Sequence, residues 1–201
     1  MKTINLDRSL DIKRFWDVIG FVNGTLITVM GSTGAGKTTV SIILACLAYA
    51  QNRKILFIGN EDYHDQFDKY SLRYGSKKTK KPREEEDWIA IRVINNDINF
   101  EEINEYVREY SPNIIVIDSY AVHKGFDDMM DFSMKIKSLA SVSEKIVIVA
   151  TESNVTSDDL AGNVHSFVSD IILFCSLQDK SIRIEVIKSR SGIKKIFESE
   201  Y

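Results

Sequence analysis

The segment Gly31-Ser-Thr-Gly-Ala-Gly36-Lys37-Thr38-Thr39 matches the phosphate-binding pattern G-x-x-x-x-G-K-[ST]. The apolar run at residues 25–30 before it predicts a buried strand, and residues 38–50 predict a helix. This context suits phosphate, because glycines let backbone N–H groups curl around the anion and the helix N-terminus adds partial positive charge. We therefore predict that this loop binds a nucleoside triphosphate.

The loop residues have distinct expected roles. Lys37 can reach the β- and γ-phosphates, and the hydroxyl of Thr38 is a candidate Mg²⁺ ligand. A flexible glycine-rich turn is the alternative interpretation, and the flanking strand and helix argue against it. The residues expected to line the nucleotide are Gly31, Ser32, Thr33, Gly34, Ala35, Gly36, Lys37, Thr38 and Thr39.

Composition restricts the class of protein. The chain has 201 residues, enough for one domain with a substantial core. Its net charge of −3 argues against a surface coated in cations for nucleic acid, although a local patch would be compatible with it. Cys46 and Cys175 have no metal-spaced neighbours, so we expect reduced, buried thiols. No apolar run is long enough for a bilayer, so we expect a cytoplasmic protein without a membrane partner.

Strand-like and helical segments alternate along the chain. Continuous apolar strands separated by helices predict an α/β fold, with a mostly parallel central sheet covered by helices on both faces. The last two strands predict an antiparallel hairpin at one edge, turning at residues 178–180. The expected strands are 25–30, 54–59, 89–94, 113–118, 145–151, 170–175 and 182–187, and the expected helices are 38–50, 63–73, 100–110 and 129–142.

Two acids follow buried strands at the edge where ligands bind in open α/β sheets. Asp118 ends an apolar run and suits the Walker B role, in which a carboxylate helps Thr38 to hold Mg²⁺; a helix N-cap is the alternative. Glu61 is the candidate base for the water that attacks the γ-phosphate. Asp62 competes for that role, and an exposed loop acid is the other alternative.

Later polar residues give less specific signals. Residues 151–154 follow another buried strand, and any of their polar side chains could sense the γ-phosphate; Asn154 is the candidate among them. Lys188 and Arg190 follow the penultimate strand, and Arg190 is a candidate arginine finger for a nucleotide on a neighbouring subunit. Ordinary solvated cations on a surface hairpin are the alternative. A basic run at 77–83 is cancelled by the acidic run at 84–87, so we expect a solvated loop there.

The order of these motifs resembles the RecA-like ATPases, and within them the branch of DnaB-type replicative helicases, KaiC-like proteins and RadA/Sms. The phosphate loop is followed by a strand leading to Glu61, by Val116-Ile-Asp118-Ser119, and by a polar segment after Ala150. Residues 154–162 and 168–174 resemble the family's segment from sensor loop to edge strand. Lys188-Ser-Arg-Ser-Gly192 is similar to the Lys-Asn-Arg-Phe-Gly element of RadA/Sms and to the Lys-x-Arg stretch of hexameric helicases.

The resemblance covers roughly residues 15–198 and implies a RecA-like P-loop NTPase domain over residues 15–201, preceded by an amino-terminal arm at 1–14. It implies ATP with Mg²⁺, Glu61 as the base, and a ring or filament with sites between subunits. It also implies that Arg190, together with Lys188, completes the site of the adjacent copy. The segments 120–128 and 156–159 would face a central channel in such a ring. They are poor in the cations that bind a nucleic-acid phosphate backbone.

Three functions are compatible with these observations. The first is a self-assembling Mg²⁺-dependent ATPase, expected as a hexamer, that works on single-stranded DNA or RNA as a helicase or motor; such a minimal core would suit a virus acting in the host cytoplasm. The second is a KaiC-like ATPase that regulates a protein partner. The third, a small-molecule kinase, is disfavoured because no arginine-rich lid lies between Glu61 and Asp118. The sequence does not distinguish ATP from GTP.

Overall fold

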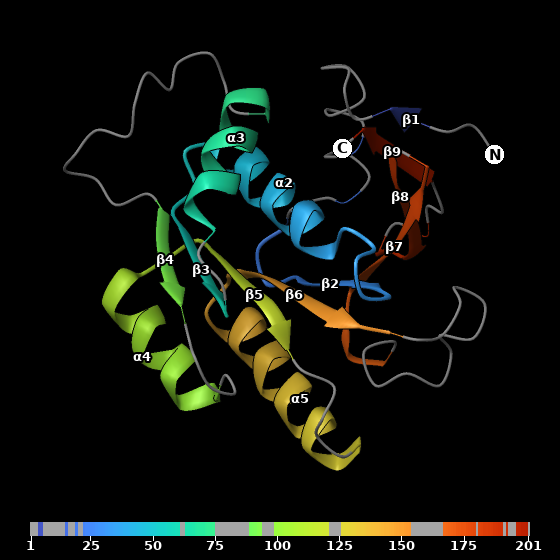
Figure 1. Ribbon diagram of the computed structural model, residues 1–201. Helices are drawn as coiled ribbons and strands as arrows, with labels where there is room; N and C mark the ends of the chain where they lie inside the picture. The colour runs from blue at the N-terminus through green and yellow to red at the C-terminus, as the bar shows by residue number, and fades with distance from the viewer. Residues whose placement is uncertain are drawn as a thin grey trace.

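The computed structural model describes residues 4–5, 15, 19, 22–60, 63–74, 89–93, 99–120, 126–153, 167–179, 181–190, 192 and 196–200. The strands are β1 (Ile4–Asn5), β2 (Leu26–Gly31), β3 (Ile55–Gly59), β4 (Ile89–Val93), β5 (Ile114–Tyr120), β6 (Ile146–Glu152), β7 (Ile171–Gln178), β8 (Ser181–Lys188) and β9 (Ile196–Glu200). The labelled helices in Figure 1 are α2 (Lys37–Tyr49), α3 (His64–Tyr74), α4 (Phe100–Tyr110) and α5 (Phe126–Val142).

These strands form one mixed sheet in the order β1-β9-β8-β7-β2-β6-β5-β3-β4. From β7 to β4 all neighbours are parallel, whereas β8 is antiparallel to both β7 and β9. The predicted α/β class, the mostly parallel sheet and the C-terminal hairpin are therefore confirmed. The hairpin does not form the edge of the sheet, because β9 and β1 continue the sheet beyond β8.

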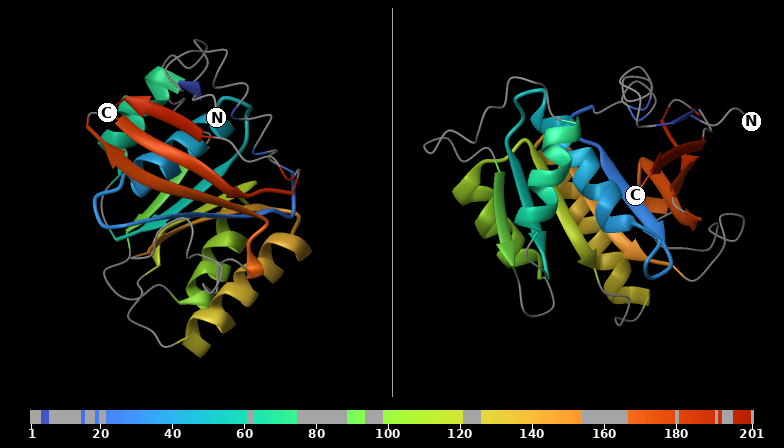
Figure 2. Two further views of the ribbon diagram at one scale, coloured as in Figure 1. Left: turned by 90° about the vertical axis from the view of Figure 1, so that its right-hand side faces the viewer. Right: turned by 45° about the horizontal axis from the view of Figure 1, so that its top comes forward.

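Helices cover both faces of the parallel part of the sheet, as the sequence predicted. α2 and α3 lie on one face, and α4 and α5 lie on the other (Figure 2). Each face of the sheet has its own large apolar core. One cluster centres on α2, and the other lies between the sheet and the helices α4 and α5. The fold is thus a three-layer arrangement in which the central strands are buried on both sides.

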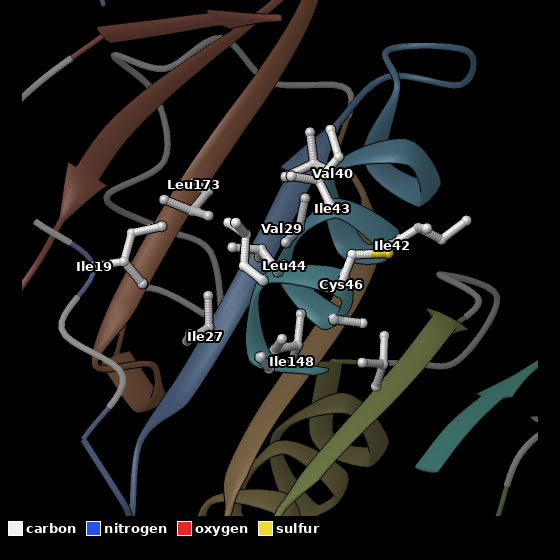
Figure 3. Packing of buried hydrophobic residues seen from close by; sticks show 14 of the residues in the cluster. Ile19, Ile27, Val29, Val40, Ile42, Ile43, Leu44, Cys46, Ile148 and Leu173 are labelled. Atoms are coloured by element: carbon white, nitrogen blue, oxygen red, sulfur yellow. The ribbon is translucent and has the colours of Figure 1, made fainter. Parts of the chain in front are cut away.

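The alternation of side chains along β2 shows how one strand joins the two cores. Ile27 and Val29 pack beneath α2, near Leu44 (Figure 3), whereas Leu26 packs on the side of α4 and α5. Successive residues of a strand point to opposite faces, so a strand covered on both sides is apolar throughout. Full burial of each such side chain is worth about 1.5–3 kcal/mol, and this anchors the strand that carries the phosphate loop.

The sequence did not predict the two strands that extend the sheet beyond β8, namely β9 and β1. β9 pairs with β8, and β1 pairs in parallel with β9 through Ile4 opposite Phe197. Phe15 is fully buried, with its ring centroid 4.5 Å from that of Phe197 in an edge-to-face arrangement. The amino-terminal segment therefore contributes β1 to the sheet of its own chain, and the other residues of 1–14 lie outside the described part.

Strand register places several predicted residues at one edge of the sheet. Gly31 at the end of β2 is paired with Glu152 of β6, and Gly59 at the end of β3 is paired with Asp118 of β5. These positions lie at the carboxyl ends of parallel strands, where open α/β sheets bind ligands. Within the part of the chain that the structure describes, no helix is both long enough and apolar enough to cross a membrane.

Candidate functional site

The loop between β2 and α2 forms a closed cradle. The N–H of Ala35 donates to the carbonyl of Ser32 at 3.1 Å, and Val40 N–H donates to the carbonyl of Gly36 at 2.9 Å to begin the helix. Gly36 has φ +86°, a left-handed backbone conformation that is strained for residues with a side chain. A Cβ atom at this position would also lie only 2.5 Å from Cδ1 of Ile182. Glycine is therefore required where the loop enters α2.

The N-terminus of α2 fits an anion. None of the described side chains caps this terminus, and no acidic residue lies in the first turn. The first N–H groups of a helix have no intrahelical partner, and together with the helix dipole they favour a negatively charged oxygen. A phosphate group would satisfy these donors, so the backbone fits the ligand that the sequence predicts.

The side chains of the loop lie around this terminus. The ammonium of Lys37 donates to the carbonyl of Ser32 at 2.8 Å and so lies across the loop. Thr38 and Thr39 are half-buried at the start of α2, whereas Ser32 and Thr33 are exposed. The structure therefore brings together the predicted loop residues, and the contact of Lys37 with its own loop is one that a phosphate oxygen could replace.

Asp118 lies on β5, one strand away from β2 across β6, and is 2% exposed. The hydroxyl of Tyr63 lies 3.3 Å from the carbonyl oxygen of Asp118 and 3.2 Å from Oδ1 of Asn60, so its one proton is shared between these two acceptors. β5 does not end at Asp118, as the sequence suggested, but continues to Tyr120. Asp118 is thus buried at the carboxyl end of the parallel strands, where Tyr63 links the ends of β3 and β5.

Glu152 belongs to the predicted polar segment 151–154, but the sequence did not single it out as a contact of the phosphate loop. Its Oε1 accepts a hydrogen bond from Oγ1 of Thr33 in the loop, and Gly31 accepts one from Ser153 N–H at 3.0 Å. The end of β6 is thus joined to the phosphate loop by both side chain and backbone. The signal in the sequence is the polar run after Ala150, in which Asn154 is the predicted sensor of the γ-phosphate. Asn154 lies outside the described residues.

The candidate base also lies outside the described residues. β3 ends at Gly59 and Asn60 follows it, but neither Glu61 nor its competitor Asp62 is described. Gly59 is paired with Asp118, so the strand leading to Glu61 ends beside the strand carrying the Walker B candidate. The role of Glu61 therefore stays a prediction.

Arg190 lies far from the phosphate loop of its own chain, whereas Lys188 is paired with Ile172 near the start of β7. Arg190 Nη2 lies 3.0 Å from Oδ1 of Asp170 and donates to the carbonyl of Gly24 at 3.2 Å. Gly24 and Asp170 precede β2 and β7, at the amino-terminal edge of the sheet. β2 has six residues, so at about 3.3 Å per residue this edge is roughly 20 Å from the loop. Arg190 therefore cannot complete its own chain's site; its role for a neighbouring copy stays a prediction.

The cysteines and acids do not form a metal cage in the described part of the chain. Cys46 and Cys175 are buried free thiols, as the sequence predicted. Burial raises the pKa of Cys175 to about 12, which keeps the thiol protonated. No group of three or more His, Cys, Asp or Glu side chains that could hold a metal occurs among the described residues. Mg²⁺ held mainly by phosphates needs only one or two protein oxygens, which Thr38 and Asp118 can supply.

Comparison with known proteins gives no further assignment: no protein-family model matches this sequence, and no curated protein matches it.

Proposed function

We propose that this protein is a Mg²⁺-dependent ATPase of the RecA type that assembles with copies of itself and couples hydrolysis to work on nucleic acid. The observation that carries the proposal is the uncapped N-terminus of α2 beneath a glycine loop crossed by Lys37. Such a cradle has the donors that bind a triphosphate. A buried Asp118 at the same edge supplies the carboxylate that Mg²⁺ requires.

The sheet order supports the RecA-like part of the proposal. β6 lies between β2, which carries the loop, and β5, which carries Asp118. The polar end of β6 can therefore contact both the loop and the space above Asp118, and the hydrogen bond between Glu152 and Thr33 is one such contact. This arrangement agrees with the motif order on which the resemblance to RecA-like ATPases rests.

Each protein group has a defined part in the proposed hydrolysis. The loop amides and Lys37 hold the β- and γ-phosphates, and Thr38 with Asp118 holds the metal ion, which when bound neutralises charge on the phosphates. Glu61 accepts the proton of the attacking water. Arg190, with Lys188, acts on the nucleotide of an adjacent copy.

A KaiC-like regulatory ATPase is the second candidate. The observation that favours it is the composition of the channel-side segments, since residues 156–159 read Thr-Ser-Asp-Asp and 120–128 contain only His123 and Lys124 as basic residues. Acidic segments repel a phosphate backbone. Turnover measured with single-stranded DNA or RNA separates the two: stimulation supports the nucleic-acid motor, and its absence in an assembly that still hydrolyses ATP supports the regulator.

Substitutions in the cradle test the proposed ATPase directly. Lys37→Ala removes the charge that faces the phosphates, so we expect Mg·ATP affinity in calorimetry to fall by at least about tenfold. Lys135→Ala is the control, because Lys135 pairs with Asp131 at 2.7 Å on the exposed side of α5. Equal affinities for wild type and Lys37→Ala would contradict the proposal.

A second substitution tests the base. Glu61→Gln keeps the shape of the side chain but cannot accept a proton, so ATP should still bind while turnover falls by about 10²–10⁴-fold. The two quantities are measured separately, by calorimetry and by phosphate release. A Glu61→Gln variant that hydrolyses ATP at the wild-type rate would exclude Glu61, and Asp62→Asn would then be examined in the same way.

A further inference from the structure

A second polar cluster lies at the amino-terminal edge of the sheet, away from the phosphate loop. Its centre is the carboxylate of Asp170, which is only 15% exposed. Oδ2 accepts from Leu26 N–H at 2.8 Å and from the ammonium of Lys137, and Oδ1 pairs with Arg190 at 3.0 Å. Lys137 and Arg190 also both reach the carbonyl of Gly24, at 3.5 and 3.2 Å. Four separate segments of the chain therefore meet at one carboxylate.

The two cations do not hold Asp170 in the same way. Lys137 shares Oδ2 with a backbone N–H and is 25% exposed, whereas among the described residues Oδ1 contacts only Arg190, which is 48% exposed. Burial alone would raise the pKa of Asp170, but the hydrogen bonds from Lys137, Leu26 N–H and Arg190 outweigh it and lower the pKa. The carboxylate thus stays ionised at neutral pH, and Arg190 is the outer member of the cluster.

The presence of two cations determines what happens if Arg190 moves away. A buried carboxylate left without a counter-ion is strongly unfavourable, so a single cation would be held in place. Here Asp170 keeps Lys137 and Leu26 N–H after Arg190 leaves. The departure of Arg190 therefore breaks one half-exposed ion pair and one exposed hydrogen bond to the carbonyl of Gly24, both of which are contacts of modest strength.

We propose that Asp170 and Lys137 are positioning residues for Arg190: Asp170 aims the guanidinium at this edge, and Lys137 lets it transfer to the triphosphate of a second copy of this chain. The inference rests on the proposed ATPase function and adds to it. Asp170 sets the starting position of Arg190, and Lys137 remains as the counter-ion of Asp170 when Arg190 transfers. Neither residue touches the nucleotide.

The decisive variant is Lys137→Met. It makes Arg190 the sole cation on Asp170, so Arg190 should be retained there and turnover in the assembled protein should fall roughly tenfold or more. KM for ATP should stay unchanged, because the nucleotide is held by the loop at the opposite edge. Lys135→Met is the matched control: it lies on the same helix, pairs with Asp131 and should keep wild-type turnover.

A double substitution separates transfer from a merely structural role. Asp170→Asn removes the charge that retains Arg190. The double variant Lys137→Met/Asp170→Asn should therefore turn over ATP faster than Lys137→Met, and at least as fast as Asp170→Asn. If the cluster only stabilised the fold, turnover would instead follow thermal stability, and Lys137→Met would keep wild-type turnover at a temperature where it is fully folded. Lys137→Arg keeps a counter-ion and should restore turnover, and thermal unfolding of every variant monitors the fold.

The same experiments distinguish the failure of this inference from that of the proposed function. If wild type and Lys137→Met bind Mg·ATP equally and turn it over at equal rates, the ATPase stands and the role of Lys137 is wrong. A double variant slower than both single variants would also overturn the inference. If the wild-type chain itself does not bind Mg·ATP, the proposed function fails and the inference fails with it.

Discussion

At the end of β3, Gly59 has no room for a side chain. A Cβ atom there would lie 2.4 Å from the carbonyl oxygen of Asp118 and 2.5 Å from Cε2 of Tyr63. The first of these atoms belongs to the backbone of a neighbouring strand and the second to a buried ring, so neither can move easily. We expect Gly59→Ala to lower the free energy of unfolding by about 1–3 kcal/mol, as overpacked cores do, measured by denaturation in urea.

A second glycine separates this steric effect from a conformational one. A Cβ on Gly34 would meet no atom within 4 Å, but its φ of +76° strains any other residue. Gly34→Ala should therefore cost about 1 kcal/mol through backbone conformation alone. Combining Tyr63→Ala with each substitution tells them apart, since removing the ring can relieve part of the clash at Gly59 and nothing at Gly34. Equal stabilities of Gly59→Ala and wild type would exclude the close approach.

At the scale of elements, β9 links the amino-terminal segment to the rest of the sheet. Phe197 is fully buried, is paired with Ile184 of β8 in the sheet, and has its ring against that of Phe15. Phe197→Ala should lower the free energy of unfolding by about 3–5 kcal/mol, because it leaves a cavity and removes the aromatic pair. Phe197→Leu, which keeps most of the volume, should cost less than about 1.5 kcal/mol. A small, equal effect of both substitutions would show that β9 adds little to stability.

The elements that the sequence predicted are those with strong local signals. The helix expected at 100–110 is α4 with the same bounds, because Asn99 caps it and accepts from Glu102 N–H at 2.8 Å. The central strands followed from continuous apolar runs. β9 has the sequence Ile-Phe-Glu-Ser-Glu, with two apolar residues, and it is a strand because it pairs with β8. Such pairing has no local signal.

The candidate site also combines residues that the local sequence predicts with contacts that depend on the order of the strands. The phosphate loop is a contiguous segment, so its residues and their geometry could be predicted together. Glu152 contacts Thr33 across a separation of 119 residues, and Arg190 lies 166 residues from Gly24, whose carbonyl it binds. These contacts depend on strand order, which neither periodicity nor composition determines. The position of Asp118 was predictable because the acid ends an apolar run, which indicates the carboxyl edge even though β5 itself continues to Tyr120.

At the scale of the whole molecule, the phosphate loop lies at the carboxyl ends of the parallel strands, and Arg190 lies at their amino-terminal ends. If Arg190 serves a nucleotide, contact between copies must be head-to-tail, with the loop of one copy facing Arg190 of the next. Asp118→Asn damages the loop side of each interface, and Arg190→Ala damages the other side. Each variant alone should therefore be nearly inactive in phosphate release.

An equal mixture of these two variants should regain activity. With random assembly, about a quarter of the interfaces combine the intact loop of Arg190→Ala with the intact Arg190 of Asp118→Asn, so roughly a quarter of wild-type turnover is expected. The control is a mixture of Asp118→Asn with Lys37→Ala: both substitutions damage the loop side, every interface stays defective, and no activity should return. Recovery in the control mixture, or none in the first mixture at any ratio, would place Arg190 outside the neighbouring site.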